Sequence, residues 1–116
     1  QGNVIIDKTA DREVHQVISE QNAWLLTSAM QDVVTKGTGG AVNFKGMSIA
    51  GKTGTTSDDK DVWFVGYTPY YTAGLWVGYD TPRWLKGLTG SAYPAEIWND
   101  FMSQIHEGLP AKNFGE

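Results

Sequence analysis

Residues 51–56 hold the side chains of this sequence that are best suited to chemistry. They read G-K-T-G-T-T, so that an ammonium group and several hydroxyl groups lie around two glycines. A lysine among hydroxyls can bind an anionic group and assist proton transfer, and a glycine lets a ligand approach the backbone closely. Such a run suits either a phosphate-binding loop or the wall of an acyl-transfer site.

The first alternative is a P-loop. Together with the preceding residues, Gly46–Thr53 satisfies the pattern G-x-x-x-x-G-K-[ST]. A P-loop requires a helix that begins at the Lys-Thr end, because the helix N-terminus helps to hold the phosphates. Residues 47–50 instead alternate like a half-buried strand, and 54–56 read G-T-T, which is a poor start for a helix. A nucleotide-binding fragment is therefore the weaker alternative.

The second alternative takes Lys52-Thr53-Gly54 as the K-T-G element of the serine enzymes that recognise penicillin. This site needs a lysine on a strand beside a cleft, hydroxyls for a substrate carboxylate, and a glycine where a side chain would block the ligand. Strict alternation places Lys52 and Gly54 on one face of the strand and Thr53 and Thr55 on the other. We therefore expect this strand at an edge of its sheet, with the ligand lying along it.

The residues that follow make the match more specific than a triplet. Asp61–Pro69 reads D-V-W-F-V-G-Y-T-P, Trp76–Asp80 reads W-V-G-Y-D, and Pro94–Trp98 reads P-A-E-I-W. The whole string resembles the C-terminal part of the transpeptidase domain of class A, bifunctional penicillin-binding proteins. Serine β-lactamases share the K-T-G strand, but the G-Y-T-P continuation favours the cell-wall enzymes.

The resemblance implies a serine-type D-Ala-D-Ala transpeptidase, which cross-links peptidoglycan stem peptides through an acyl-enzyme and binds β-lactams as substrate mimics. Lys52 would keep the site electropositive and support proton transfer. Thr53 and Thr55 would bind the substrate carboxylate, and the backbone N–H of Thr55 would be one oxyanion donor. Gly54 and Thr56 would complete the substrate-binding wall. No cofactor and no metal ion is implied.

The nucleophile of that family is missing from this sequence. The S-x-x-K and S-x-N motifs of the family lie well upstream of K-T-G, and only 51 residues precede Lys52. Ser57–Lys60 spells S-x-x-K, but it belongs to a polar loop after the strand, and no S-x-N occurs. We therefore expect this chain alone to be inactive, with the N-terminal part of the same domain as its partner.

Composition limits the remaining classes. The 116 residues, 41% of them hydrophobic, suffice for one domain. The net charge of -4 gives no basic surface for nucleic acid, and the absence of cysteine excludes a disulfide scaffold. The chain starts with Gln1, so we expect residues 1–116 to be a single-domain fragment, with a processed complete domain as the alternative. The resemblance places the parent protein at the extracytoplasmic face of a bacterial membrane, anchored by a segment outside this chain.

The apolar pattern predicts an α/β fold, in which helices flank an antiparallel sheet as in part of a β-lactamase/transpeptidase-like fold. Strands are expected at 2–7, 47–56, 62–67 and 72–79, and helices at 20–36 and from Pro94 to about Gly108. The strands at 62–67 and 72–79 are apolar on both faces, which predicts cover on both sides. An exposed sheet edge would allow self-association, and residues 110–116 are expected to fray.

The apolar stripes of the helices are predicted to face the core. They comprise Trp24, Leu25, Leu26, Met30 and Val33 in the first helix and Ile97, Trp98, Phe101 and Ile105 in the last. The tryptophans leave one further alternative, a non-catalytic glycan-binding module with exposed indole rings. Trp63, Trp76 and Trp98 fit core positions better, and Trp84 is the exception. His15 and His106 show no partner pattern.

Overall fold

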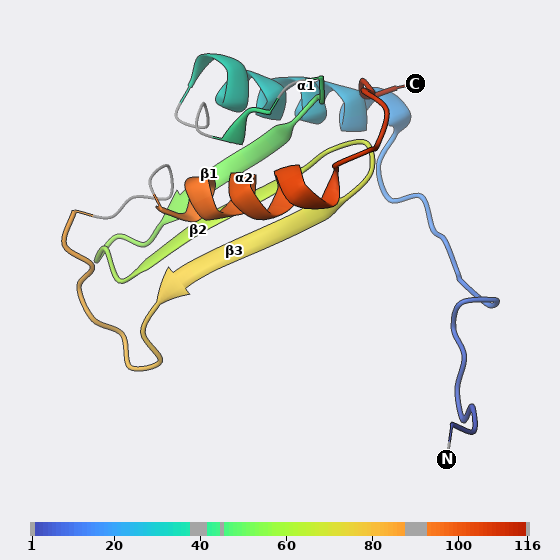
Figure 1. Cartoon of the computed structure of the whole chain (residues 1–116), viewed down its shortest axis with the longest axis horizontal. Coiled ribbons are helices and arrows are strands. Elements are labelled where there is room, and N and C mark those ends of the chain that lie inside the picture. Colours follow the sequence, from blue (N-terminus) through green and yellow to red (C-terminus); the bar gives the residue numbers. More distant parts are fainter. Residues whose placement is uncertain (1, 38–41, 45, 88–92, 116) are drawn as a thin grey trace.

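The structure, a computed structural model, describes residues 2–37, 42–44, 46–87 and 93–115. Its elements are, in chain order, α1 (Glu20–Lys36), β1 (Ala50–Thr55), β2 (Asp61–Tyr67), β3 (Thr72–Gly78) and α2 (Tyr93–Ile105). The strands form one antiparallel sheet in the order β1-β2-β3 (Figure 1). This arrangement confirms the predicted antiparallel sheet flanked by helices.

Helix α1 has the predicted bounds but not the predicted buried face. Ser19 caps it, with its side chain accepting a hydrogen bond from the Asn22 amide at 3.2 Å. Val34 is its buried residue, whereas Trp24, Leu25 and Leu26 are 59, 60 and 57% exposed. The helix packs against β1, and periodicity alone does not say which side of an apolar helix will meet a neighbour.

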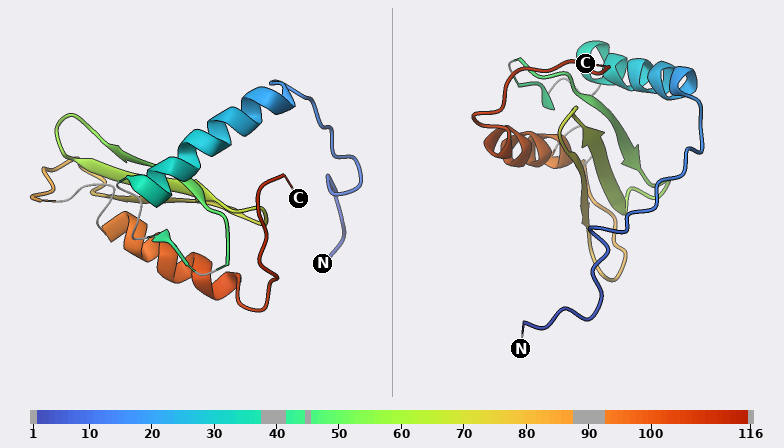
Figure 2. Two further views of the ribbon diagram at one scale, coloured as in Figure 1. Left: turned by 90° about the horizontal axis from the view of Figure 1, so that it is seen from above. Right: turned by 90° about the vertical axis from the view of Figure 1, so that its right-hand side faces the viewer.

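Helix α2 packs on one face of the sheet (Figure 2). It buries Pro94, Ala95, Trp98 and Met102, and the Trp98 Nε1–H donates to the Ala73 carbonyl at 2.9 Å. The predicted stripe was right at Trp98 alone, because the buried positions 95, 98 and 102 turn the remaining predicted members, Ile97, Phe101 and Ile105, toward the exposed flank of the helix.

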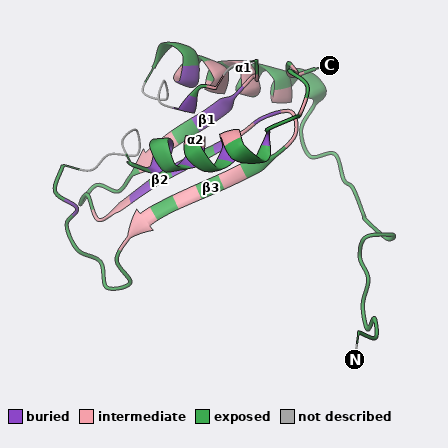
Figure 3. Ribbon diagram, in the orientation of Figure 1, coloured by how far each residue is buried: buried purple, intermediate pink, exposed green. Residues whose placement is uncertain are grey.

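The core joins both helices to the central strand. Its buried residues are Val34, Val42, Ile49, Phe64, Ala95, Trp98 and Met102. The rings of Phe64 and Trp98 meet edge to face, with centroids 5.2 Å apart. Figure 3 shows this buried region between β2 and the helices.

The opposite face of the sheet is covered at one end only in the described part of the chain. At that end the Tyr67 hydroxyl lies 2.7 Å from Thr27 Oγ1 of α1, and Ala50, opposite Tyr67, is fully buried. Burial alternates along β2, so that Val62 and Phe64 are buried while Trp63 and Val65 are 45 and 42% exposed. The prediction that helices cover both faces is therefore right only in part, because α2 packs on the Phe64 side while α1, which packs against β1 and reaches Tyr67, leaves Trp63 and Val65 half-exposed.

Two predictions about chain ends and strand limits are also corrected. Residues 2–7 form no strand, and Val4, Ile5 and Ile6 are 76, 93 and 75% exposed, because no described strand lies beside them to supply hydrogen bonds. This extended segment (Figure 1) raises the radius of gyration to 16.9 Å, against about 13 Å for a compact chain of this length. Strand β1 starts at Ala50 rather than at residue 47.

The C-terminal residues do not fray as predicted. The Ser48 amide donates to the Lys112 carbonyl at 3.2 Å, and the Tyr70 hydroxyl donates to the Pro110 carbonyl at 2.9 Å. Phe114 lies against Tyr67, with ring centroids 5.4 Å apart. The tail therefore returns to the sheet, and these partners lie too far away in sequence for local pattern to reveal them.

His106 ties the end of α2 to the turn between β2 and β3. Its Nδ1 lies 2.6 Å from the Met102 carbonyl, which can only accept, so Nδ1 carries the proton. Its Nε2 then accepts from the Thr68 hydroxyl at 2.7 Å. Since Thr68 Oγ1 also accepts the amides of Tyr70 and Tyr71, this buried histidine completes a fully paired network.

We expect His106→Ala to lower the free energy of unfolding by about 1–3 kcal/mol, because it leaves the buried Thr68 hydroxyl without its acceptor. His15→Ala is the matched control, since the His15 side chain is 79% exposed. Urea unfolding of the three proteins measures both effects. Equal stability of the two variants would contradict this account of the network.

Candidate active site

Strand β1 presents Lys52 to solvent on the sheet face opposite to α2. Lys52 lies across from Val65, and Gly54 lies across from Trp63, which in turn pairs with Trp76. The Lys52 Nζ donates to the carbonyl of Thr53 at 3.0 Å and is exposed. The ammonium group is therefore available at the surface, beside the uncovered apolar part of the sheet.

The hydroxyls of the run lie on the other side of the strand. Thr53 pairs with Phe64 and Thr55 pairs with Val62, so both follow the Phe64 face. Within the described residues β1 pairs with β2 alone, which places it at an edge of the sheet as the sequence predicts. Only along such an edge can groups from both faces of one strand reach the same ligand.

Gly51 and Gly54, which flank Lys52 and Thr53, differ in the space that is available for a side chain. A Cβ at Gly51 would lie 2.6 Å from Phe64 Cζ and 3.2 Å from the Val65 carbonyl, so a side chain there would force the buried Phe64 ring to move. A Cβ at Gly54 would meet only Trp63 Cβ, at an ordinary 3.5 Å. The packing of this chain therefore explains Gly51 but leaves space above Gly54.

Thr56 has its side chain in the turn between β1 and β2. Its Oγ1 accepts the amides of Lys60 and Asp61 at 3.1 and 3.2 Å. Ser57 lies in this exposed turn, in the polar loop where the sequence places it, and not at the start of a buried helix. The S-x-x-K spelling of 57–60 thus has none of the surroundings that a nucleophile of the family would need.

The local geometry does not fit a P-loop. Lys52 and Thr53 lie inside strand β1, where a P-loop would have its bend and the first turn of a helix. The next helix in the described part of the chain is α2, which begins at Tyr93. In the part of the chain that the structure describes, no helix begins directly after Lys52 and Thr53 to help bind phosphate.

Beside Lys52 lies an apolar row that sequence reasoning assigned to the core. Trp63, Val65 and Trp76 form this row, and each is 42–45% exposed. The indole rings of Trp63 and Trp76 lie 6.4 Å apart, and the Trp76 Nε1–H donates to Asp61 Oδ1 at 2.9 Å. Trp98 is core as predicted, and Trp84 is exposed at 62%. Counting every second residue from Trp63 would have grouped it with Val65, but the inter-strand register is what adds Trp76 and places the row on the lysine face.

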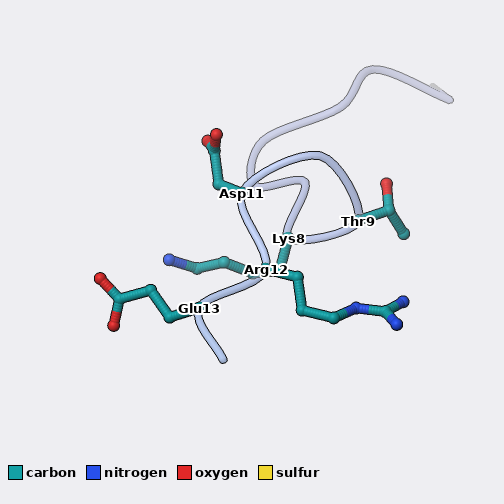
Figure 4. A pocket seen from close by; sticks show the side chains of 5 residues that line it. All are labelled: Lys8, Thr9, Asp11, Arg12 and Glu13. Carbon is teal, nitrogen blue, oxygen red and sulfur yellow. The ribbon is translucent and has the colours of Figure 1, made fainter. Parts of the chain in front are cut away.

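A polar hollow in the N-terminal segment lies apart from β1 in sequence and carries no comparable chemistry. It is lined by Lys8, Thr9, Asp11, Arg12 and Glu13. All belong to one exposed stretch, and Figure 4 shows the side chains of Asp11, Arg12 and Glu13 pointing in different directions. We assign it no function.

The fold thus has an edge strand bearing K-T-G, paired with a W-F-V-G-Y strand against which α2 packs. The profile of the penicillin binding protein transpeptidase domain matches residues 3–103, and the chain belongs to this family.

Penicillin-binding protein 1A of Clostridium perfringens strain 13 is 37% identical over 111 residues, which are 96% of this chain and 16% of that protein. The protein of the same name from Rickettsia conorii is 42% identical over 102 residues, which are 87% of this chain and 13% of the relative. The chain thus spans less than a fifth of the length of these relatives. None of its described helices is long and apolar enough to cross a membrane.

Gly51 and Gly54 have different space around them, so the same substitution, glycine to alanine, should have different effects at the two positions. Gly51→Ala should lower the free energy of unfolding by about 1–3 kcal/mol, since the new methyl group overpacks the core. Gly54→Ala is the matched control and should change it by less than about 0.5 kcal/mol. Urea unfolding checks both values, and a larger loss at Gly54 than at Gly51 would overturn the assignment.

Proposed function

We propose that this chain forms the K-T-G wall of a D,D-transpeptidase domain that cross-links peptidoglycan stem peptides by serine acyl transfer and binds β-lactams. The observation that carries the proposal is the exposed Lys52 in the middle of an edge strand, next to a glycine that the packing of this chain does not require. A cationic edge of this shape suits an extended substrate that ends in a carboxylate.

Each side chain of this run has a different role in the proposed site. Lys52 attracts and orients the substrate carboxylate and assists proton transfer, since its ammonium group is the cation of the strand. Thr53 and Thr55 bind the carboxylate, and the Thr55 amide donates to the developing oxyanion. Gly54 leaves room for the ligand. Thr56 contributes through the turn that it closes, which fixes the end of β1.

The nucleophilic serine comes from another part of the same domain. The sequence lacks S-x-N, and its single S-x-x-K is in an exposed turn. The row of Trp63, Val65 and Trp76 lies on the same face as Lys52 and is only half covered. Packing of the serine-bearing part on this row would bury apolar surface and bring the serine beside the lysine. This chain alone is therefore inactive.

The substrate also suggests the location. Peptidoglycan is cross-linked outside the cytoplasmic membrane, so we place the parent protein at the extracytoplasmic face of the bacterial membrane, anchored by a segment outside this chain.

We expect a fluorescent penicillin to leave the 116-residue chain unlabelled and to label a chimera that joins it to the upstream part of the transpeptidase domain of the Clostridium perfringens relative. In this chimera, Lys52→Ala should lower the rate constant of acylation by about 10²–10⁴-fold, because the variant removes the group that assists proton transfer. Stopped-flow fluorescence measures the rate.

Lys60→Ala is the matched control for this experiment. Lys60 lies eight positions after Lys52 in the exposed turn, where it pairs with Asp58 at 3.4 Å, so its loss should leave acylation unchanged. Labelling of the isolated chain would contradict the missing nucleophile. Binding of peptide-free glycan strands to the isolated chain would support the glycan-binding alternative, for which the exposed pair of Trp63 and Trp76 is the supporting observation.

Strand β3 offers the edge for the self-association that the sequence suggests. It pairs with β2 alone among the described residues, and Thr72–Gly78 contains neither a charge nor a proline to protect it. We expect the isolated chain to form dimers in a concentration-dependent manner, with Thr72→Lys weakening the dimer about tenfold or more. Sedimentation equilibrium measures the constants, and a monomer at all concentrations would exclude this contact.

A further inference from the structure

Residues 109–114, which we name the C-terminal strap, cross back over the start of the sheet after α2 ends. The Leu109 amide donates to the His106 carbonyl at 3.0 Å, and Gly108 turns the chain with a φ of 82°. In Figures 1 and 2 this last segment runs back to α1 and to the start of β1. The strap lies beyond residue 103, where the family profile ends.

The strap holds the residues that lead into β1. Met47 and Lys112 form a parallel β-bridge, and the Ser48 amide donates to the Lys112 carbonyl at 3.2 Å. The Ser48 hydroxyl donates to Asn113 Oδ1 at 2.8 Å. Ser48 is two residues before the start of β1 and four before Lys52, so the strap sets where the strand begins.

The end of the strap also contacts the first pair of residues between β1 and β2. Ala50 of β1 lies opposite Tyr67 of β2. Phe114 packs edge to face on the Tyr67 ring, and the Tyr67 hydroxyl lies 2.7 Å from Thr27 Oγ1 on α1. The strap, α1 and β2 thus meet at Tyr67, where the strand of Lys52 starts.

The beginning of the strap is anchored to the turn between β2 and β3. The Tyr70 hydroxyl donates to the Pro110 carbonyl at 2.9 Å, and the Lys112 Nζ lies 5.5 Å from the centre of the Tyr70 ring. Both ends of the strap therefore rest on the β2–β3 hairpin, and its middle holds the residues before β1.

We propose that the C-terminal strap is a positioning element for the K-T-G strand, and that Phe114 is its main positioning residue. The inference rests on the proposed function, because it concerns where Lys52 sits during acyl transfer. Strand β1 pairs with one strand among the described residues, and although α1 and the Phe64 ring fix its register, the residues just before it need a further hold. The strap supplies this hold through the Met47–Lys112 bridge and the Ser48 amide.

The first test follows amide hydrogen exchange in the 116-residue chain. Phe114→Ala should speed exchange at Ser48 and along β1 by about tenfold, through easier local opening, and leave Val62 and Phe64 of β2 unchanged. Phe101→Ala is the matched control, since this phenylalanine is 56% exposed on α2. An unchanged exchange rate at Ser48, or a uniform increase in exchange across the sheet, would contradict the proposal that the strap holds β1 locally.

The second test measures penicillin acylation in the chimera described above. Phe114→Ala should lower the acylation rate constant about tenfold, since small displacements of a catalytic group slow reaction strongly, while the final labelled fraction stays the same. Phe114→Tyr should restore the rate, and Phe101→Ala should not alter it. An unchanged rate constant, or a fall in labelled fraction alone, would overturn the proposal. An unlabelled wild-type chimera would refute the proposed function instead, and the exchange experiment would still decide whether the strap holds β1.

Discussion

The ring of Phe64 sets the register on which the rest of the structure depends. It fills the space where side chains at Gly51 and Gly66 would lie, with virtual Cβ atoms at 2.6 and 2.8 Å, and it packs against Trp98. A shift of β1 by one residue would bring Lys52 or Ala50 onto this ring, which the packing does not allow. The same contact that builds the core therefore points Lys52 away from it, to the open face.

The K-T-G run is consequently a mixture of structural and chemical positions. Gly51 serves the core, and Thr56 closes a turn through two amides. Lys52 and Gly54 face open space on one side of the strand. The six residues of the run therefore differ in role, and the atoms that surround each position show which of them serve packing and which face solvent.

The sequence was sufficient where local signals dominate. The helix at 20–36, the two strands predicted at 62–67 and 72–79 and the strand of Lys52 follow from helical spacing, apolar runs and turn residues, and the structure differs from them by a few residues at most. The sequence was insufficient where contacts with residues far away along the chain decide whether a side chain is buried. Val4 to Ile6 have strand propensity but no described neighbouring strand, Leu26 is apolar but exposed, and Phe114 packs on a residue 47 positions away. Apolar pattern shows what can be buried, and tertiary contacts decide what is.

The exposed row beside Lys52 links packing to chemistry in the proposed site. Trp63, Val65 and Trp76 are about half covered, Lys52 lies across from Val65, and the Asp61 carboxylate accepts the Trp76 Nε1–H. Covering the row with the serine-bearing part of the domain would remove water from around the ammonium group as well as bury the indoles. Since the interaction between charges grows as the local dielectric falls, the same contact would strengthen the attraction of Lys52 for a substrate carboxylate. Assembly of the domain and the electrostatics of its site would then depend on one surface.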